Sequence, residues 1–96
     1  MSSKVIDAAV AALNEKMSGG FDGLAKFVIT GEGSVVIDAE GARAGDDEAD
    51  VTLTADADVF QSLMTGELDP TVAFMGGKLS VDGDMALAMK LGATLA

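Results

Sequence analysis

Residues 50–91 read DVTLTADADVFQSLMTGELDPTVAFMGGKLSVDGDMALAMKL, and this stretch contains most of the information about the fold. Apolar and polar residues alternate over 50–55, which is typical of a strand with one buried face. A shorter alternation over 78–82 predicts a second strand, with Leu79 and Val81 facing inward. Strands and helices are therefore expected to alternate in this half of the chain.

Three helices are predicted between and after these strands. The first begins with Asp56 as its N-cap, has apolar residues at i, i+3 and i+4, and ends at Gly66. The second begins at Asp69-Pro70, a capping side chain followed by a proline, and stops at Gly76-Gly77. The third begins at Asp84 and is apolar on nearly every side.

The N-terminal half is predicted to contain one helix and one hairpin. Helical spacing covers 3–18, with Ser2 or Ser3 as the N-cap and Gly19-Gly20 as the stop. Period-two alternation then covers 25–39 on both sides of a glycine turn, which predicts a β-hairpin with one buried face.

The order of these elements predicts an α+β fold, with an antiparallel sheet and helices on one face. Residues 40–49, EGARAGDDEA, are polar and interrupted by glycine, so they are expected to form an exposed loop. At 96 residues and with a modest core, the chain is expected to be one domain spanning 1–96.

The composition excludes several classes of chemistry. The chain has no His and no Cys, which excludes His- or Cys-based nucleophile systems, zinc and haem ligation by these residues, iron–sulfur clusters and disulfides. The paired carboxylates fit helix caps and a solvated loop better than an EF-hand. We therefore expect no metal, no cofactor and no enzymatic activity.

The net charge limits the kinds of partner that the chain is expected to bind. A net charge of −10 with 4% aromatic residues is unfavourable for binding nucleic acid, and it opposes approach to an anionic membrane. No stretch has the 18 or more apolar residues typical of a membrane span. The expected location is the cytoplasm.

Methionine is concentrated in the helices of the second half. Met is flexible and polarizable, so these residues either fill a core that is short of aromatics or line a pocket for a flexible apolar ligand. The apolar C-terminal helix also needs cover from a partner, a second subunit or a lipid. The four methionines in question are Met64, Met75, Met85 and Met89.

Residues 50–91 resemble the sterol carrier protein 2 family of nonspecific lipid-transfer domains. The pieces that match occur in the order and at the spacing of the family. They are Ala49-Asp50 with the strand that follows, Leu63-Met64-Thr65-Gly66, Asp69-Pro70, Ala73-Phe74, Gly77-Lys78-Leu79, Gly83-Asp84-Met85 and Ala88-Met89-Lys90-Leu91.

This resemblance implies a five-stranded, mostly antiparallel sheet with helices packed on one face, enclosing an apolar cavity. It also implies a fifth strand near Glu40–Arg43. The chain departs from the family pattern at three positions. Gly76 and Gly92 stand where the family has residues expected to make polar contacts to a lipid head group. Val35 stands where the family has an aromatic residue in the hairpin. An acyl chain is therefore a better expectation than a sterol.

The resemblance implies a non-catalytic intracellular carrier for a fatty acid, a fatty acyl-CoA or a similar lipid. The C-terminal helix would be a movable cover with Gly83 and Gly92 as hinges, and the protein would be a monomer or weak homodimer with transient membrane contact. The alternative is a protein-interaction or dimerisation module that uses the same helix. The expected cavity residues are Val10, Phe27, Phe60, Met64, Phe74, Met75, Met85, Ala88 and Met89.

Overall fold

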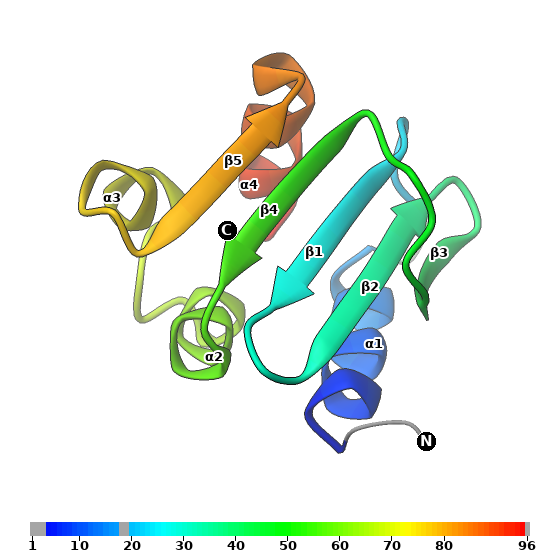
Figure 1. The fold of residues 1–96 in the computed structure, drawn as a ribbon, viewed down its shortest axis with the longest axis horizontal. Coiled ribbons are helices and arrows are strands. Elements are labelled where there is room, and N and C mark those ends of the chain that lie inside the picture. The colour runs from blue at the N-terminus through cyan, green and yellow to red at the C-terminus, as the bar shows by residue number, and fades with distance from the viewer. Residues whose placement is uncertain (1–3, 18–19, 96) are drawn as a thin grey trace.

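A twisted sheet forms one layer of the molecule, with strand order β3-β2-β1-β4-β5 (Figure 1). The computed structural model describes residues 4–17 and 20–95. The strands within them are β1 (Ala25–Ile29), β2 (Gly33–Asp38), β3 (Gly41–Ala44), β4 (Val51–Ala55) and β5 (Leu79–Gly83). The five-stranded sheet expected from the resemblance is confirmed, including its fifth strand, β3.

The sheet is mixed. The β1–β2, β2–β3 and β4–β5 pairs are antiparallel, whereas β1 and β4 run parallel, with Ala25 opposite Val51 and Ile29 opposite Ala55. The mostly antiparallel sheet is confirmed, and the parallel pair is an addition that period-two patterning cannot reveal.

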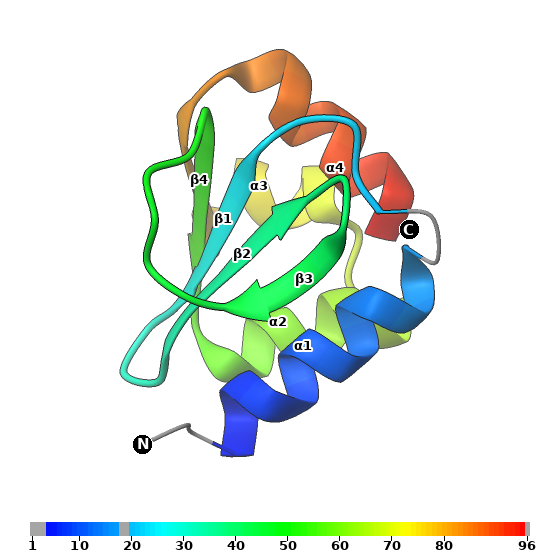
Figure 2. The ribbon, with the colours of Figure 1, turned by 90° about the vertical axis from the view of Figure 1, so that its right-hand side faces the viewer.

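The helices of the described residues all lie on one side of the sheet (Figure 2). They are α1 (Lys4–Lys16), α2 (Ala57–Thr65), α3 (Pro70–Met75) and α4 (Met85–Leu95). The α+β arrangement with helices on one face is confirmed. The predicted caps of the first helix at Ser2, Ser3 and Gly19 lie outside the described residues.

Two of the three predicted aspartate caps are made. Asp69 Oδ1 accepts a hydrogen bond from the backbone N–H of Thr71 at 2.8 Å, and Asp84 Oδ1 accepts one from Ala86 at 2.9 Å. Asp56 occupies the N-cap position of α2 with an extended backbone but makes no side-chain cap hydrogen bond. The predicted N-cap position of Asp56 is therefore confirmed, although its side chain does not accept a capping hydrogen bond.

The core lies between the sheet and the helices. Residues 25, 27 and 29 of β1 are all buried, as their alternation predicts. Phe27 is fully buried at the centre, and its ring meets the Phe60 ring edge-to-face with centroids 4.7 Å apart. Such aromatic pairs contribute about 0.5–1.5 kcal/mol beyond burial, so this contact anchors α2 to the sheet.

The prediction of an exposed loop over 40–49 is partly wrong. Its first part is β3, and its second part crosses the outer face of the sheet (Figure 2). The crossing is required because β3 is at one edge while β4 lies beyond β2 and β1.

Two polar contacts hold the crossing segment against the sheet. Ser34 Oγ donates a hydrogen bond to Gly45 O at 2.6 Å. Lys26 Nζ lies 3.0 Å from Asp46 Oδ1, and this ion pair lowers the pKa of the Asp46 carboxyl. Val36 is fully buried beneath this segment.

Gly83 joins β5 to α4 where the backbone of Asp50 lies very close. Its φ is +109°, and a Cβ there would overlap the carbonyl oxygen of Asp50. We expect Gly83→Ala to lower the free energy of unfolding by about 3 kcal/mol, because strain and steric overlap act together. The same close approach opposes the expected hinge at Gly83.

Gly77→Ala is the matched control for that substitution. Gly77 also has a positive φ of +76°, but nothing lies within 4 Å of an added Cβ, so only backbone strain of about 1–2 kcal/mol is expected. Urea denaturation of both variants measures the difference. Equal losses would contradict the importance of the contact with Asp50.

Candidate functional site

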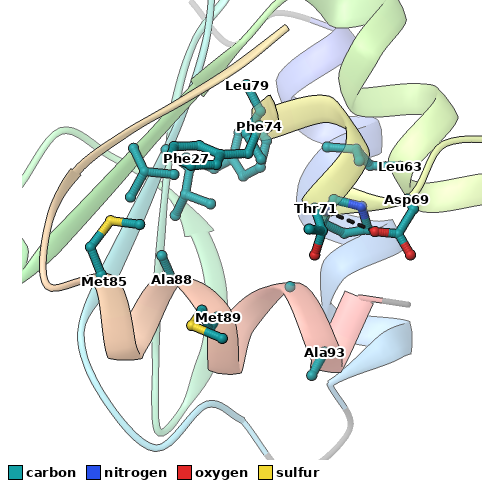
Figure 3. Close-up of a pocket in the computed structure, with 14 residues that line it drawn as sticks. Phe27, Leu63, Asp69, Thr71, Phe74, Leu79, Met85, Ala88, Met89 and Ala93 are labelled. Carbon is teal, nitrogen blue, oxygen red and sulfur yellow. Dashed lines mark hydrogen bonds between the residues drawn. The ribbon is translucent and has the colours of Figure 1, made fainter. Parts of the chain in front are cut away.

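An open pocket of about 440 Å³ lies between the sheet, α3 and α4 (Figure 3). Its floor comes from strand residues that face the helices and from Leu63 of α2, and its walls come from α3 with the preceding Asp69 and from most of the length of α4. The lining residues are Phe27, Leu53, Leu63, Asp69, Pro70, Thr71, Phe74, Leu79, Val81, Met85, Ala88, Met89, Gly92 and Ala93.

The floor of the pocket is part of the hydrophobic core. Phe27, Leu53, Leu63 and Leu79 are all buried, so their positions are set by packing on several sides. Close-packed interiors allow little independent movement of such side chains. The floor is therefore a preformed apolar surface.

The wall formed by α4 is only partly covered. Ala88 and Leu91 are buried, but Met85 is 46% exposed and Met89 is 74% exposed. On the facing wall, Phe74 of α3 is 43% exposed. The structure thus provides the uncovered apolar helix that the sequence predicts, beside a pocket that opens to solvent instead of the enclosed cavity implied by the resemblance.

The polar groups of the lining lie at one end. The hydrogen bond from the Thr71 backbone holds the Asp69 carboxylate there, opposite the C-terminal part of α4 (Figure 3). No lysine or arginine of residues 4–17 and 20–95 lines the pocket. The site can bury an apolar chain and meet a polar head with one carboxylate and one hydroxyl.

Lys90 ties α4 to the segment before β1. Its Nζ lies 3.1 Å from the backbone oxygen and 3.0 Å from Oδ2 of Asp22, and 5.8 Å from the centre of the Phe21 ring. An exposed ion pair of this kind contributes about 0–1 kcal/mol. The contact directs the positive charge of Lys90 away from the pocket.

The other ion pairs lie on the outer face of the sheet. Arg43 pairs with Asp38, and its guanidinium lowers the pKa of the Asp38 carboxyl. Arg43 also lies 3.7 Å from Asp47. These charges stabilise the crossing segment and the β2–β3 turn but do not face the pocket.

Some of the predicted cavity residues meet at the pocket and some do not. Phe27, Phe74, Met85, Ala88 and Met89 line it. The other four predicted residues, Val10, Phe60, Met64 and Met75, are absent from its lining.

Each of these four side chains lies outside the pocket lining for a different reason. Phe60 is buried behind Phe27, while Val10 and Met64 pack against other parts of the core. Met75 is 80% exposed, because α3 turns Ala73 toward the core and Met75 away from it. The sequence does not specify how α3 is rotated.

Several residues that line the pocket are not among the predicted cavity residues, although strand alternation or helical spacing indicates the orientation of some of them. Leu79 and Val81 were predicted to face inward, without being assigned to a cavity. Gly92 is seven residues after Met85, so it continues the same helical face. Asp69 and Thr71 carried only a capping signal, and nothing local places a cap beside a pocket.

The acidic side chains and the helices of residues 4–17 and 20–95 bear on two other kinds of site. No group of three or more of its acidic side chains is placed to hold a metal ion. None of its helices combines the length and the apolar character needed to cross a membrane.

Parts of larger proteins are similar in sequence to this chain. The chain is 37% identical over 87 residues to hydroxysteroid dehydrogenase-like protein 2 of Xenopus tropicalis, covering 82% of this chain and 21% of that protein. It is 42% identical over 65 residues to peroxisomal multifunctional enzyme A of Dictyostelium discoideum, covering 68% and 14%. The chain thus spans about a fifth or less of the length of these relatives.

A solved structure agrees over nearly the whole chain. Sterol carrier protein 2 of Aedes aegypti, solved in complex with palmitate, has a TM-score of 0.79 and 26% identity, covering 98% of this chain and 96% of that one. The sequence model of the SCP-2 sterol transfer family matches residues 6–96. The resemblance seen in the sequence is confirmed, and the chain belongs to the SCP-2 sterol transfer family.

Proposed function

We propose that this chain is a non-catalytic carrier that binds one acyl lipid in the pocket between the sheet, α3 and α4. The observation that supports this most strongly is the apolar pocket itself, whose volume of about 440 Å³ lies in the range of about 300–1,000 Å³ usual for small-molecule sites. The palmitate complex of the mosquito homologue supports an acyl chain as the ligand.

The energetics favour a flexible chain. Each buried methylene contributes about 0.8 kcal/mol before the ordering of the chain is subtracted. The floor is preformed by Phe27 and the leucines around it, so most of the reorganisation falls on Met85 and Met89 at the mouth. Methionine adapts to irregular apolar shapes, which suits lipids of different length.

Mass spectrometry of the freshly purified protein tests the carrier function. Native spectra are compared with spectra recorded after denaturation and organic extraction. A stoichiometric adduct that is released as an acyl lipid is the expected result. A bare protein mass, together with no thermal shift on adding acyl lipids, would overturn the proposal.

Exposed Met85 and Met89 also fit the alternative function, in which α4 pairs with another protein or with a second copy. Light scattering of the lipid-free protein distinguishes the two. An obligate dimer, whose stability rises with protein concentration, would favour the interaction module. A monomer that binds lipid would favour the carrier.

We further propose that loading and release use contact between the exposed side of α3 and a lipid surface. Val72 is 59% exposed and Met75 is 80% exposed, and both belong to the short helix whose Phe74 lines the pocket. Val72 and Met75 are three residues apart, so they lie on the same side of α3, and exposed apolar patches mark membrane or protein interaction sites. The net charge of −10 favours a zwitterionic surface over an anionic one.

Met75→Glu should slow the transfer of a fluorescent fatty acid between phosphatidylcholine vesicles by about tenfold, because insertion of one large apolar side chain is lost. Binding of the same fatty acid in solution should not change. Ala11→Glu, on the exposed side of α1, adds the same charge far from α3 and should transfer lipid normally. Equal slowing in both variants would contradict a docking role for α3.

A further inference from the structure

Asp69 is the one ionisable side chain among the lining residues that the structure describes. Its carboxylate is held in place because Oδ1 accepts the backbone N–H of Thr71 at 2.8 Å, and Pro70 restricts the backbone between them. The pocket therefore has a fixed negative charge at its polar end.

No positive charge is placed to balance it. Lys26 and Arg43 pair with acidic side chains across the sheet, and Lys90 pairs with Asp22. None of the six basic residues of the chain, all of which the structure describes, lines the pocket. The net charge of −10 adds to the local repulsion of an anionic head group.

We propose that Asp69 makes the pocket selective for acyl lipids with an uncharged, hydrogen-bond-donating head group, such as long-chain alcohols or monoacylglycerols. A hydroxyl donates a hydrogen bond to the carboxylate, whereas the carboxylate of a fatty acid cannot donate and is repelled. Coenzyme A esters, with several negative charges, are disfavoured most. This inference rests on the proposed lipid-carrier function and specifies its ligand.

The test compares dodecanol, laurate and lauroyl-CoA, which share one chain length. Dissociation constants are measured at pH 7 by displacement of a fluorescent long-chain alcohol and by calorimetry. The wild type should bind dodecanol more tightly than laurate, and lauroyl-CoA most weakly. Asp69→Asn should tighten laurate binding by about fivefold, the upper end of what one exposed charge pair contributes. It should change dodecanol binding by less than about twofold, because the amide oxygen of asparagine still accepts a hydrogen bond from the hydroxyl.

Asp84→Asn is a matched control. Asp84 caps α4 as Asp69 caps α3, and the substitution removes the same charge, but Asp84 does not line the pocket. Asparagine is also a good N-cap, so both variants should fold. The laurate-to-dodecanol ratio of Asp84→Asn should stay near that of the wild type.

The outcomes separate this inference from the function on which it rests. If the wild type binds none of the three ligands, the carrier function fails. If it binds them but Asp69→Asn shifts the ratio no more than Asp84→Asn, the carrier function stands and selectivity by Asp69 is overturned. Raising the salt concentration should reduce the wild-type discrimination, because the Debye length falls from about 8 Å at 0.15 M to about 3 Å at 1 M.

Discussion

Ala88→Phe should strongly weaken lipid binding. Ala88 is 7% exposed and lines the pocket from α4, so a phenyl ring there occupies space that the acyl chain needs. Losing contact with about three methylenes at about 0.8 kcal/mol each weakens binding by about fiftyfold. Titration with a fluorescent acyl lipid measures the effect.

The control is Ala86→Phe, on the same helix. Ala86 is exposed and is not among the lining residues, so this variant should bind lipid as the wild type does. If Ala88→Phe fails to fold, Ala93→Phe narrows the pocket from an exposed position and should still weaken binding. Normal affinity in a folded Ala88→Phe or Ala93→Phe variant would show that the ligand lies elsewhere.

Phe27→Ala should lower the free energy of unfolding by about 3–5 kcal/mol, as truncation of a fully buried phenylalanine does. Phe27 is in the central strand, between Val35 and Leu53 in the register, and its ring packs on Phe60. A domain of this size is stable by about 5–14 kcal/mol, so the variant should be close to unfolding. Urea denaturation measures the loss.

Phe74→Ala provides the comparison within the same pocket. Phe74 is 43% exposed on the opposite wall, so its truncation should cost less than about 1.5 kcal/mol while still weakening lipid binding. Together the variants separate the floor, which supports the fold, from the wall, which contacts the ligand. Equal losses of stability would contradict this division.

Local pattern identified the elements that have a strong period. The alternation over 51–55 and the helical spacing of the first helix both match the structure, because one face of β4 and one face of α1 are buried. The strand Gly41–Ala44 lacks such a pattern, and only the family resemblance indicated it. Its backbone is satisfied by β2 and by Asn14 of α1, whose Oδ1 accepts the Ala42 N–H at 2.7 Å.

Site residues were harder to predict than elements. Three of the predicted cavity residues, Met85, Ala88 and Met89, lie on α4 and line the pocket. Met75 had the same composition signal, yet it faces away, because the rotation of α3 depends on how Ala73 packs against the core. Composition shows that methionine is abundant, but only packing decides which methionines share a pocket.

The sequence alone determined the α+β class, the caps at Asp69 and Asp84, the apolar C-terminal helix and the family, since each depends on residues close together in the chain. The tertiary structure alone decided the parallel pairing of β1 with β4 and the path of the chain across the sheet. It also decided that the Asp69 cap lies in the wall of an apolar pocket. These features depend on contacts between distant segments, which local periodicity does not encode.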